Sequence, residues 1–305
     1  DIGLEVYLSY SLAGLADSFE HHVKIPSRHQ AFFLSENESL KAPSLLDDSR
    51  LRTPTFSLPD AWIINEELRS VTVPSGLYKL QYPIKMPRNY RLIIESNVEF
   101  VLGEHFYWEV NGPVSIGMIG PEHGKVVFRP QEDSWKGMIV YQQSEVSNIQ
   151  NVLFSGMKGI DTPGANITGG VTVLGGELLL RKTNFGNVFT EDALNVVDAK
   201  VSIDEIEIHD AASDAIDLDF CEGELKNVIF ESISGDGLDI SGSRVTLKHL
   251  KSHNVGDKAV SIGERSVFSG LDLQISNCSM GVVSKDDSMA DVREVRIEDC
   301  HHSLV

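Results

Sequence analysis

The sequence predicts an all-β protein whose main body is a right-handed parallel β-helix, and three observations lead to this fold class. From about Trp62 onward, short β-rich runs alternate with glycine, proline and asparagine, without a helical pattern of roughly a dozen residues between them. A 22-residue period then aligns chemically similar residues through the second half of the chain. Each period holds two or three short apolar strands and lacks the hexapeptides typical of left-handed β-helices. Periods of this length indicate a solenoid in which each coil buries its apolar face against its neighbours.

Two aliphatic columns define the buried side of the repeat. The first column consists of Leu194, Ile216, Leu238, Val260 and Val282. The second lies two residues further on and consists of Val196, Leu218, Ile240 and Ile262. Because strand residues two apart point to the same side, we expect both columns in the core and the positions between them on the outside. We also expect the small residues at 193, 215, 237, 259 and 281 to leave a shallow groove beside the outward positions.

The N-terminal part of the chain has a different texture. Residues 1–60 mix apolar and polar residues, with loosely helical spacing from Leu4 to Phe19, and then turn polar. We interpret this part as a cap or linker, which would also suit the tail of an upstream domain. Residues 61–305 are predicted to form the β-helix.

The charge balance excludes two classes of partner. The chain has 26 basic and 45 acidic residues, a formal net charge of −19. Nucleic acids and anionic membrane surfaces bind clustered Lys and Arg, so neither is expected as a partner. No apolar run is long enough for a membrane span. An acidic polysaccharide would also be repelled, unless bound cations reverse the local field.

Two cysteines are separated by one repeat. Cys278 and Cys300 should therefore stack on neighbouring coils, where the spacing of parallel strands would allow a disulfide. We expect two buried thiols instead, as members of an interior column.

Acidic residues gather on the outward side of the same strands. The outward columns hold Asn195, Asp217, Asp239 and Ser261, with Asp219 two residues beyond Asp217. A turn column beside them holds Asp192, Asp214, Asp236 and Lys258. Carboxylates stacked at the coil spacing raise each other's pKa. The repulsion can be relieved by a bound Ca²⁺, by a proton held on one carboxyl as a general acid, or by the Lys258 ammonium.

The two kinds of column suggest different roles. Aspartates in the turn column are slightly better explained as caps for backbone N–H groups than as catalytic groups. Asp217, Asp219 and Asp239 stand on a flat strand face, where capping is no explanation and where aspartate is a poor strand former. We therefore predict Ca²⁺ ligands among Asp214, Asp217, Asp219 and Asp239.

Further polar residues follow on the next coils. Lys258, Arg265 and Lys285 are candidates for contacts with an anionic sugar. The residues predicted to bind substrate are Asn195, Ser261, Glu264 and Lys285.

The aligned motifs resemble a known group of proteins. They are Glu191-Asp-Ala-Leu-Asn195, Ser213-Asp-Ala-Ile-Asp-Leu-Asp-Phe220, Gly235-Asp-Gly-Leu-Asp-Ile-Ser-Gly-Ser243 and Asp257-Lys-Ala-Val-Ser-Ile-Gly-Glu264. Over residues 65–305 the chain resembles bacterial right-handed parallel β-helix repeat proteins, some of which carry spore-coat-kinase-like domains. This likeness implies an extracellular or cell-surface location in a bacterium.

A more distant resemblance is to the pectate-lyase-like superfamily. In its calcium-dependent lyases an aspartate cluster holds Ca²⁺ and a nearby Lys or Arg removes the proton α to a uronic acid carboxylate. Asp214, Asp217, Asp236 and Asp239, with Lys258 on the next coil, would fit that pattern, although Lys258 falls in a turn column. The adjacent aspartate pair and the Gly-His-Gly motif of the superfamily's glycoside hydrolases are missing from this face.

These inferences lead to a prediction of function with two alternatives. The leading prediction is a Ca²⁺-assisted lyase or epimerase of an acidic polysaccharide, with Lys258 as the base, Arg265 paired with the substrate carboxylate, and Asp236 as a further catalytic group. The first alternative is a glycoside hydrolase that uses two of Asp214, Asp236 and Asp239. The second is a non-catalytic surface or matrix module that binds Ca²⁺.

Overall fold

The chain divides into two compact units, Asp1–Thr53 and Pro54–Val305. The computed structural model describes residues 4–11, 18–25, 58–118, 124–142, 145–162 and 165–305, and these residues contain no α-helix. They accordingly include no helix of the length and apolarity that a membrane span requires.

The described part of the first unit is a β-hairpin. Strand β1 (Leu4–Ser11) pairs antiparallel with β2 (Ser18–Ile25). The loosely helical spacing noted in the sequence is therefore misleading here. In the sequence, Leu4, Val6 and Leu8 recur with a period of two, which indicates a strand instead. The role of this segment as a cap or linker stays a prediction.

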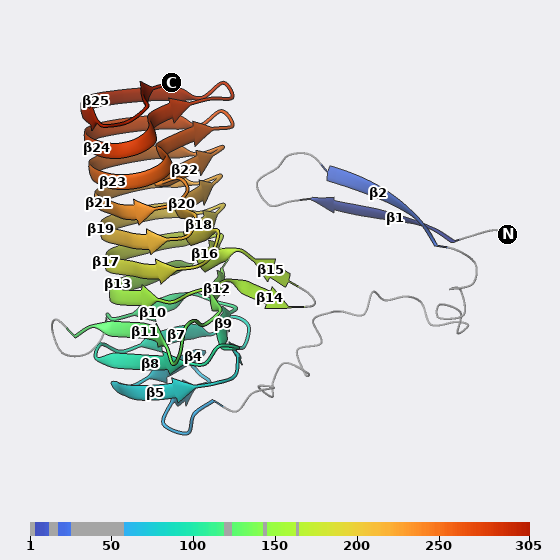
Figure 1. Ribbon diagram of the computed structural model, residues 1–305. Helices are drawn as coiled ribbons and strands as arrows, with labels where there is room; N and C mark the ends of the chain where they lie inside the picture. The colour runs from blue at the N-terminus through green and yellow to red at the C-terminus, as the bar shows by residue number, and fades with distance from the viewer. Residues whose placement is uncertain (1–3, 12–17, 26–57, 119–123, 143–144, 163–164) are drawn as a thin grey trace. The chain divides into compact units, whose positions relative to one another are not determined.

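The second unit is a parallel β-helix, as the sequence predicts (Figure 1). Its strands are β3 (Ile63–Asn65), β4 (Ser70–Val73), β5 (Gly76–Leu80), β6 (Ile84–Lys85), β7 (Arg91–Ile94), β8 (Val98–Leu102), β9 (Tyr107–Val110), β10 (Val114–Ile116), β11 (Val126–Pro130), β12 (Gly137–Tyr141), β13 (Val146–Ser155), β14 (Ile160–Thr162), β15 (Ala165–Ile167), β16 (Gly169–Leu174), β17 (Glu177–Val188), β18 (Asp192–Val197), β19 (Lys200–Ala211), β20 (Asp214–Asp219), β21 (Glu222–Ile233), β22 (Leu238–Ser241), β23 (Arg244–Gly263), β24 (Val267–Ser284), β25 (Met289–Glu298) and β26 (His302–Leu304). Strands of successive coils pair in parallel, apart from the antiparallel pairs β3–β4 and β14–β15.

The predicted interior column is confirmed. Leu194 pairs with Ile216, Ile216 with Leu238, Leu238 with Val260, and Val260 with Val282. All five side chains are buried in one continuous core. We use the name acidic sheet for the layer that carries this column: β16, β18, β20, β22, residues 258–263 of β23 and residues 280–284 of β24.

Toward the N-terminal end of the unit, the core is built from aromatic rings. Phe128 stacks on Phe100 and on Phe154, with ring centroids 4.9 and 4.7 Å apart, and Phe154 stacks on Phe185 at 5.2 Å. These separations match the spacing of neighbouring coils, because equivalent positions lie one strand apart.

The column of small residues lies in the core, so the groove expected there is absent. Ala193, Ala215 and Ala259 are completely buried. A Cβ atom on Gly237 would lie 2.8 Å from the Phe230 ring. Small side chains are needed at this column because each of these residues is buried together with the aliphatic residue that follows it, where ring and aliphatic side chains already fill the space.

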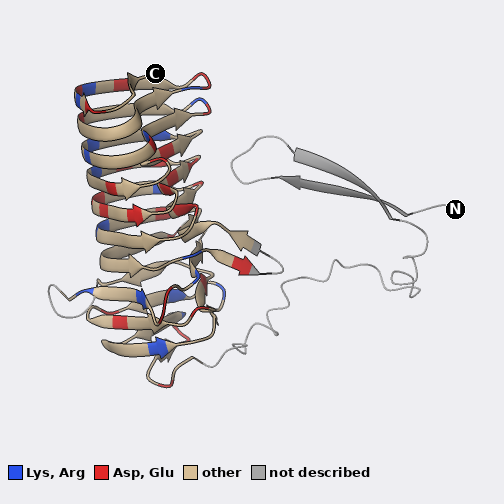
Figure 2. Cartoon of the chain, viewed as in Figure 1, with Lys and Arg blue, Asp and Glu red and all other residues tan. Residues whose placement is uncertain are grey.

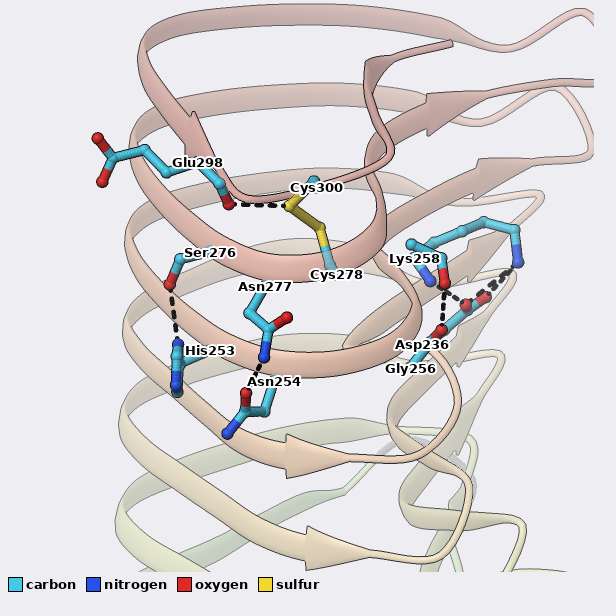
Figure 3. The surroundings of a disulfide bond; sticks show 11 residues. Asp236, His253, Asn254, Gly256, Lys258, Ser276, Asn277, Cys278, Glu298 and Cys300 are labelled. Carbon is cyan, nitrogen blue, oxygen red and sulfur yellow. Dashed lines mark hydrogen bonds and ion pairs between the residues drawn. A yellow bond between two sulfur atoms is a disulfide. The ribbon is translucent and has the colours of Figure 1, made fainter.

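Cys278 and Cys300 lie on neighbouring coils and form a disulfide (Figure 3). Their predicted position is confirmed, whereas the expectation of two free thiols is wrong. The Cα atoms are 4.7 Å apart, within the range that a disulfide spans, because parallel strands hold equivalent positions at this distance. Cys221 is the free cysteine and is buried.

Because of the disulfide, we expect one free thiol per chain before reduction. Protein unfolded in denaturant without reductant should react with one equivalent of a thiol reagent per chain, from Cys221, and with three after reduction. Reduction should lower the stability of the last coils by about 3 kcal/mol, since the bridge closes a loop of one coil. A count of three before reduction would contradict the bridge.

Candidate functional site

The candidate site is the outward face of the acidic sheet. Along it Asn195 pairs with Asp217, Asp217 with Asp239, and Asp239 with Ser261. Figure 2 shows acidic residues on successive strands of this sheet. The 22-residue period puts the same side of the strand outward in every coil, so the carboxyl groups accumulate on one surface.

The turn column caps backbone groups of the following coil. The Asp236 N–H donates to Asp214 Oδ1 at 2.8 Å, and the Lys258 N–H donates to Asp236 Oδ1 at 2.9 Å. The capping role expected for this column is therefore confirmed for Asp214 and Asp236. After this one hydrogen bond, each carboxylate can still accept hydrogen bonds from other partners or bind a cation.

Lys258 is the local counter-ion of this column. Its ammonium group donates to both oxygens of Asp236 at 3.1 Å and to Asp257 Oδ2 at 2.6 Å (Figure 3). Burial disfavours the ammonium form, but the bonds to Asp257 and Asp236 outweigh it and raise the pKa of Lys258. Lys258 in this arrangement is a protonated, ion-paired lysine. It is a poor base, because it must lose its own proton before it can accept one.

Three carboxylates converge beside Lys258. Asp214, Asp236 and Asp239 each present an oxygen, and these three oxygens lie within 4.8 Å of one another. We call these residues the carboxylate triad. Burial raises the pKa of Asp214 and of Asp236, against the bonds that each accepts from the next coil. Asp239 contributes the unexplained feature: its Oδ1 is buried and has no hydrogen-bond partner among the described residues.

The triad suits a calcium ion. Ca²⁺ binds carboxylate oxygens at about 2.3–2.6 Å, so oxygens around one ion can be up to about 5 Å apart. A buried carboxylate oxygen without a partner is costly, and such an ion would satisfy it. Of the predicted ligands, Asp214 and Asp239 belong to the triad, whereas Asp217 and Asp219 lie outside it. Asp236, predicted as a catalytic group, also belongs to the triad, and the roles of all these residues stay predictions.

Asp217 and Asp192 are the most perturbed acids of this face. Burial, followed by the charge of Asp219 and then Asp192, raises the pKa of Asp217 to about 8. Burial, followed by the charge of Asp214, raises the pKa of Asp192 to about 7. The Asn195 amide donates to Asp217 Oδ2 at 3.0 Å and to Asp192 Oδ2 at 3.4 Å, and so bridges the two carboxyls. Near neutral pH this end of the face holds protons.

The remaining predicted residues surround the far end of the face. Glu264 and Arg265 line an open pocket of about 440 Å³ together with Asp286 and Asp287. Arg265 and the neighbouring Lys285 are exposed and form no ion pair within the described part of the chain. Burial, and then the charge of Glu264, raise the pKa of Asp219, which connects this end to the acidic face. Ser261, a predicted substrate contact, is completely buried.

An apolar cluster that the sequence did not indicate lies at the other end of this column. The outward column continues from Asn195 through Thr172 to Ile139. Tyr107, Ile139 and Ile160 form a small buried cluster, and Ile167 packs against it. Ile160 and Ile167 belong to the antiparallel pair β14–β15 (Figure 1), for which the Pro163-Gly164 dipeptide was the available signal in the sequence.

Comparisons with known proteins add a likeness in architecture. No family model and no curated protein matches the chain. Among solved structures, a double mutant of the periplasmic alginate epimerase AlgG is similar over 81% of each chain, with 9% identity and a TM-score of 0.31. Another crystal structure of the same epimerase covers the same shares, with 10% identity and a TM-score of 0.23. At these TM-scores the likeness carries no argument, and the parallel β-helix rests on the strand pairing of the chain itself. The function is argued from the acidic face.

Proposed function

We propose that this protein is a carbohydrate-active β-helix that acts on an acidic polysaccharide as a Ca²⁺-assisted lyase or epimerase. The observation that carries the proposal is the buried Asp239 oxygen without a partner, next to two further carboxylates within 4.8 Å. A dication there would also offset the repulsion between the acidic face and a polyanion.

Each group of residues takes a distinct part. The carboxylate triad would hold the ion, and bound Ca²⁺ would acidify the proton α to the substrate carboxylate. Arg265 and Lys285, exposed and free of ion pairs within the described ranges, would pair with uronate carboxylates. Lys258 would accept the proton at Nζ only as the neutral amine, so it must first release its own proton to solvent and give up its bonds to Asp236 and Asp257. A dication bound by Asp236 would compete with the ammonium for the same oxygens and would favour this loss.

The disulfide supports a location outside the cytoplasm. Bridges such as Cys278–Cys300 persist in oxidising compartments, which include the periplasm and the cell surface. A polymeric substrate would be met there.

The proposal is tested in deuterated water. Alginate or polygalacturonate fragments are incubated with the protein and Ca²⁺, and deuterium at the carbon α to the carboxylate is measured by NMR. Both lyase and epimerase chemistry remove this proton, and a lyase also yields an unsaturated product that absorbs in the ultraviolet. Turnover should stop with a chelator. Calcium binding without exchange or cleavage of any fragment would leave a non-catalytic calcium module.

A second candidate is a glycoside hydrolase, and the pKa of Asp217 favours it. A carboxyl with a pKa of about 8 is protonated at neutral pH and can serve as a general acid. Its neighbour Asp239 on the next coil would be the second carboxylate. New reducing ends without ultraviolet absorbance, unaffected by a chelator, would support this activity over the first.

A further inference from the structure

Phe220 is an exposed aromatic residue at a position whose backbone conformation disfavours one. It follows β20 at the corner next to the acidic sheet, with φ +54° and 44% of the side chain exposed. The equivalent corners of the adjacent coils carry Asp198 and Gly242, also at positive φ. Asp and Gly tolerate this conformation, whereas a bulky residue is an outlier there. An exposed ring held at such a corner points to a function.

The ring borders an open pocket on the side of the preceding coil. The space has a volume of about 510 Å³ and is lined by Gly176, Glu177, Asp198, Ala199, Lys200, Phe220 and Glu222. On the following coil the ring lies over Gly242, because a Cβ there would be 2.7 Å from its Cδ1 atom. The ring is thus supported from one neighbouring coil and accessible toward the other.

The polar lining of this pocket is available for a ligand. Asp198, Lys200 and Glu222 are all exposed. Lys200 lies opposite Glu222 in the strand register, yet it forms no ion pair with any residue of the described ranges. Glu177, opposite Lys200 on the preceding coil, is the third carboxylate of the lining. An aromatic ring beside a lysine without an ion pair and three carboxylates offers an apolar platform, an anion partner and acceptors for hydroxyl groups.

We propose that this pocket is a sugar subsite in which the C–H face of a uronate ring packs on Phe220 while its carboxylate pairs with Lys200. The assignment rests on the proposed function for the substrate class. It extends that function by placing a binding subsite at the corner beside the acidic sheet. Asp219 directly precedes Phe220, so a chain bound in the pocket leads onto the acidic face.

The test measures binding of short acidic fragments. Tetra- to hexasaccharides of polygalacturonate and alginate are titrated by calorimetry in the presence of Ca²⁺, with maltohexaose as the neutral probe. Phe220→Gly should weaken the binding of the acidic fragments about tenfold, which corresponds to about 1.4 kcal/mol, because the sugar loses its contact with the ring. Phe220→Trp should retain binding. Lys200→Gln should weaken the acidic fragments and leave the neutral one unchanged.

The controls separate the subsite from the fold and from the proposed function. Glycine suits the positive φ, so Phe220→Gly should fold, and Phe220→Asn is a second variant that this conformation tolerates. Phe189→Ala removes another exposed ring, outside the pocket, and should bind like the wild type. If the fragments bind in a way that depends on Phe220, but neither turnover nor a heat of calcium binding is observed, the proposed function is refuted and the subsite is not. Unchanged binding by Phe220→Gly, or no fragment binding by the wild type at millimolar concentration, overturns the subsite.

Discussion

Replacing Asp239 by asparagine is expected to weaken calcium binding at the acidic face strongly while the β-helix stays folded. The change removes one charge of the carboxylate triad and replaces one carboxylate oxygen by an NH₂ group, which cannot bind Ca²⁺. The affinity for Ca²⁺ should fall on the order of a hundredfold, because affinity follows the charge and number of the oxygen ligands. Deuterium exchange into acidic fragments should fall with it. Calorimetry with Ca²⁺ and the NMR assay measure both effects.

Two features of the structure make this variant informative. Asp239 lies on the outer face of β22 and is not part of the hydrophobic core. A loss of activity in this variant therefore cannot be attributed to unfolding. Its charge adds to the repulsion on Asp217 and Asp219, so the melting temperature in a chelator should be equal to or above that of the wild type. Asp133→Asn, an exposed aspartate away from the acidic sheet, is the matched control. Wild-type protein without calcium heat at millimolar metal would refute the ion site.

Without calcium, the protein is expected to lose stability as the pH rises from about 5 to about 8. The pKa of Asp217 is raised to about 8 and that of Asp192 to about 7, whereas both groups titrate near 3.8 in an unfolded chain. Between these values the folded state holds protons that the unfolded state has released. Unfolding then releases protons, so the free energy of unfolding falls with pH across this range and levels off above it.

The size of this effect is bounded by the number of groups. Each proton retained only by the folded state changes the free energy of unfolding by at most about 1.4 kcal/mol per pH unit. The melting temperature in a chelator should therefore drop on the order of 5–10 °C over this range. Asp217→Asn should remove more than half of the drop, because its amide stays neutral and can still accept from Asn195. Added Ca²⁺ should restore stability at the upper pH. A melting temperature independent of pH would show that these carboxyls are not protonated in the folded state.

The repeat of the fold was predictable because it is a local property of the chain. Interior residues recur at the coil length, as in the column from Leu194 to Val282, and a solenoid coil contacts only its neighbours. The small column misled the prediction at one point. Strict alternation would turn Ala193 outward, but Ala193 is completely buried, as is the adjacent Leu194. Alternation predicts burial for every second position only, so it cannot predict two consecutive buried residues.

The sequence predicts which acidic residues lie on the candidate face, but not which atoms their side chains contact. Register alone brings Asp214, Asp217, Asp236 and Asp239 onto one face. Which oxygens are free depends on side-chain rotamers and on the neighbouring coil, and there Lys258 holds Asp236 while Asn195 holds Asp217. The same holds for Cys278 and Cys300: their adjacency follows from the period, and their bond from the geometry.

The sequence by itself determined the parallel β-helix, its 22-residue register on the acidic sheet and the accumulation of acids on one outer face. These features depend on the periodic order of apolar and acidic residues, which can be read directly from the sequence. Only the tertiary structure decided that Asp236 joins the triad, that one oxygen of Asp239 is buried without a partner, and that the Phe220 ring borders a pocket. Whether a carboxylate oxygen is buried, and whether it has a hydrogen-bond partner, depends on residues of the neighbouring coil. Packing sets the directions of those side chains.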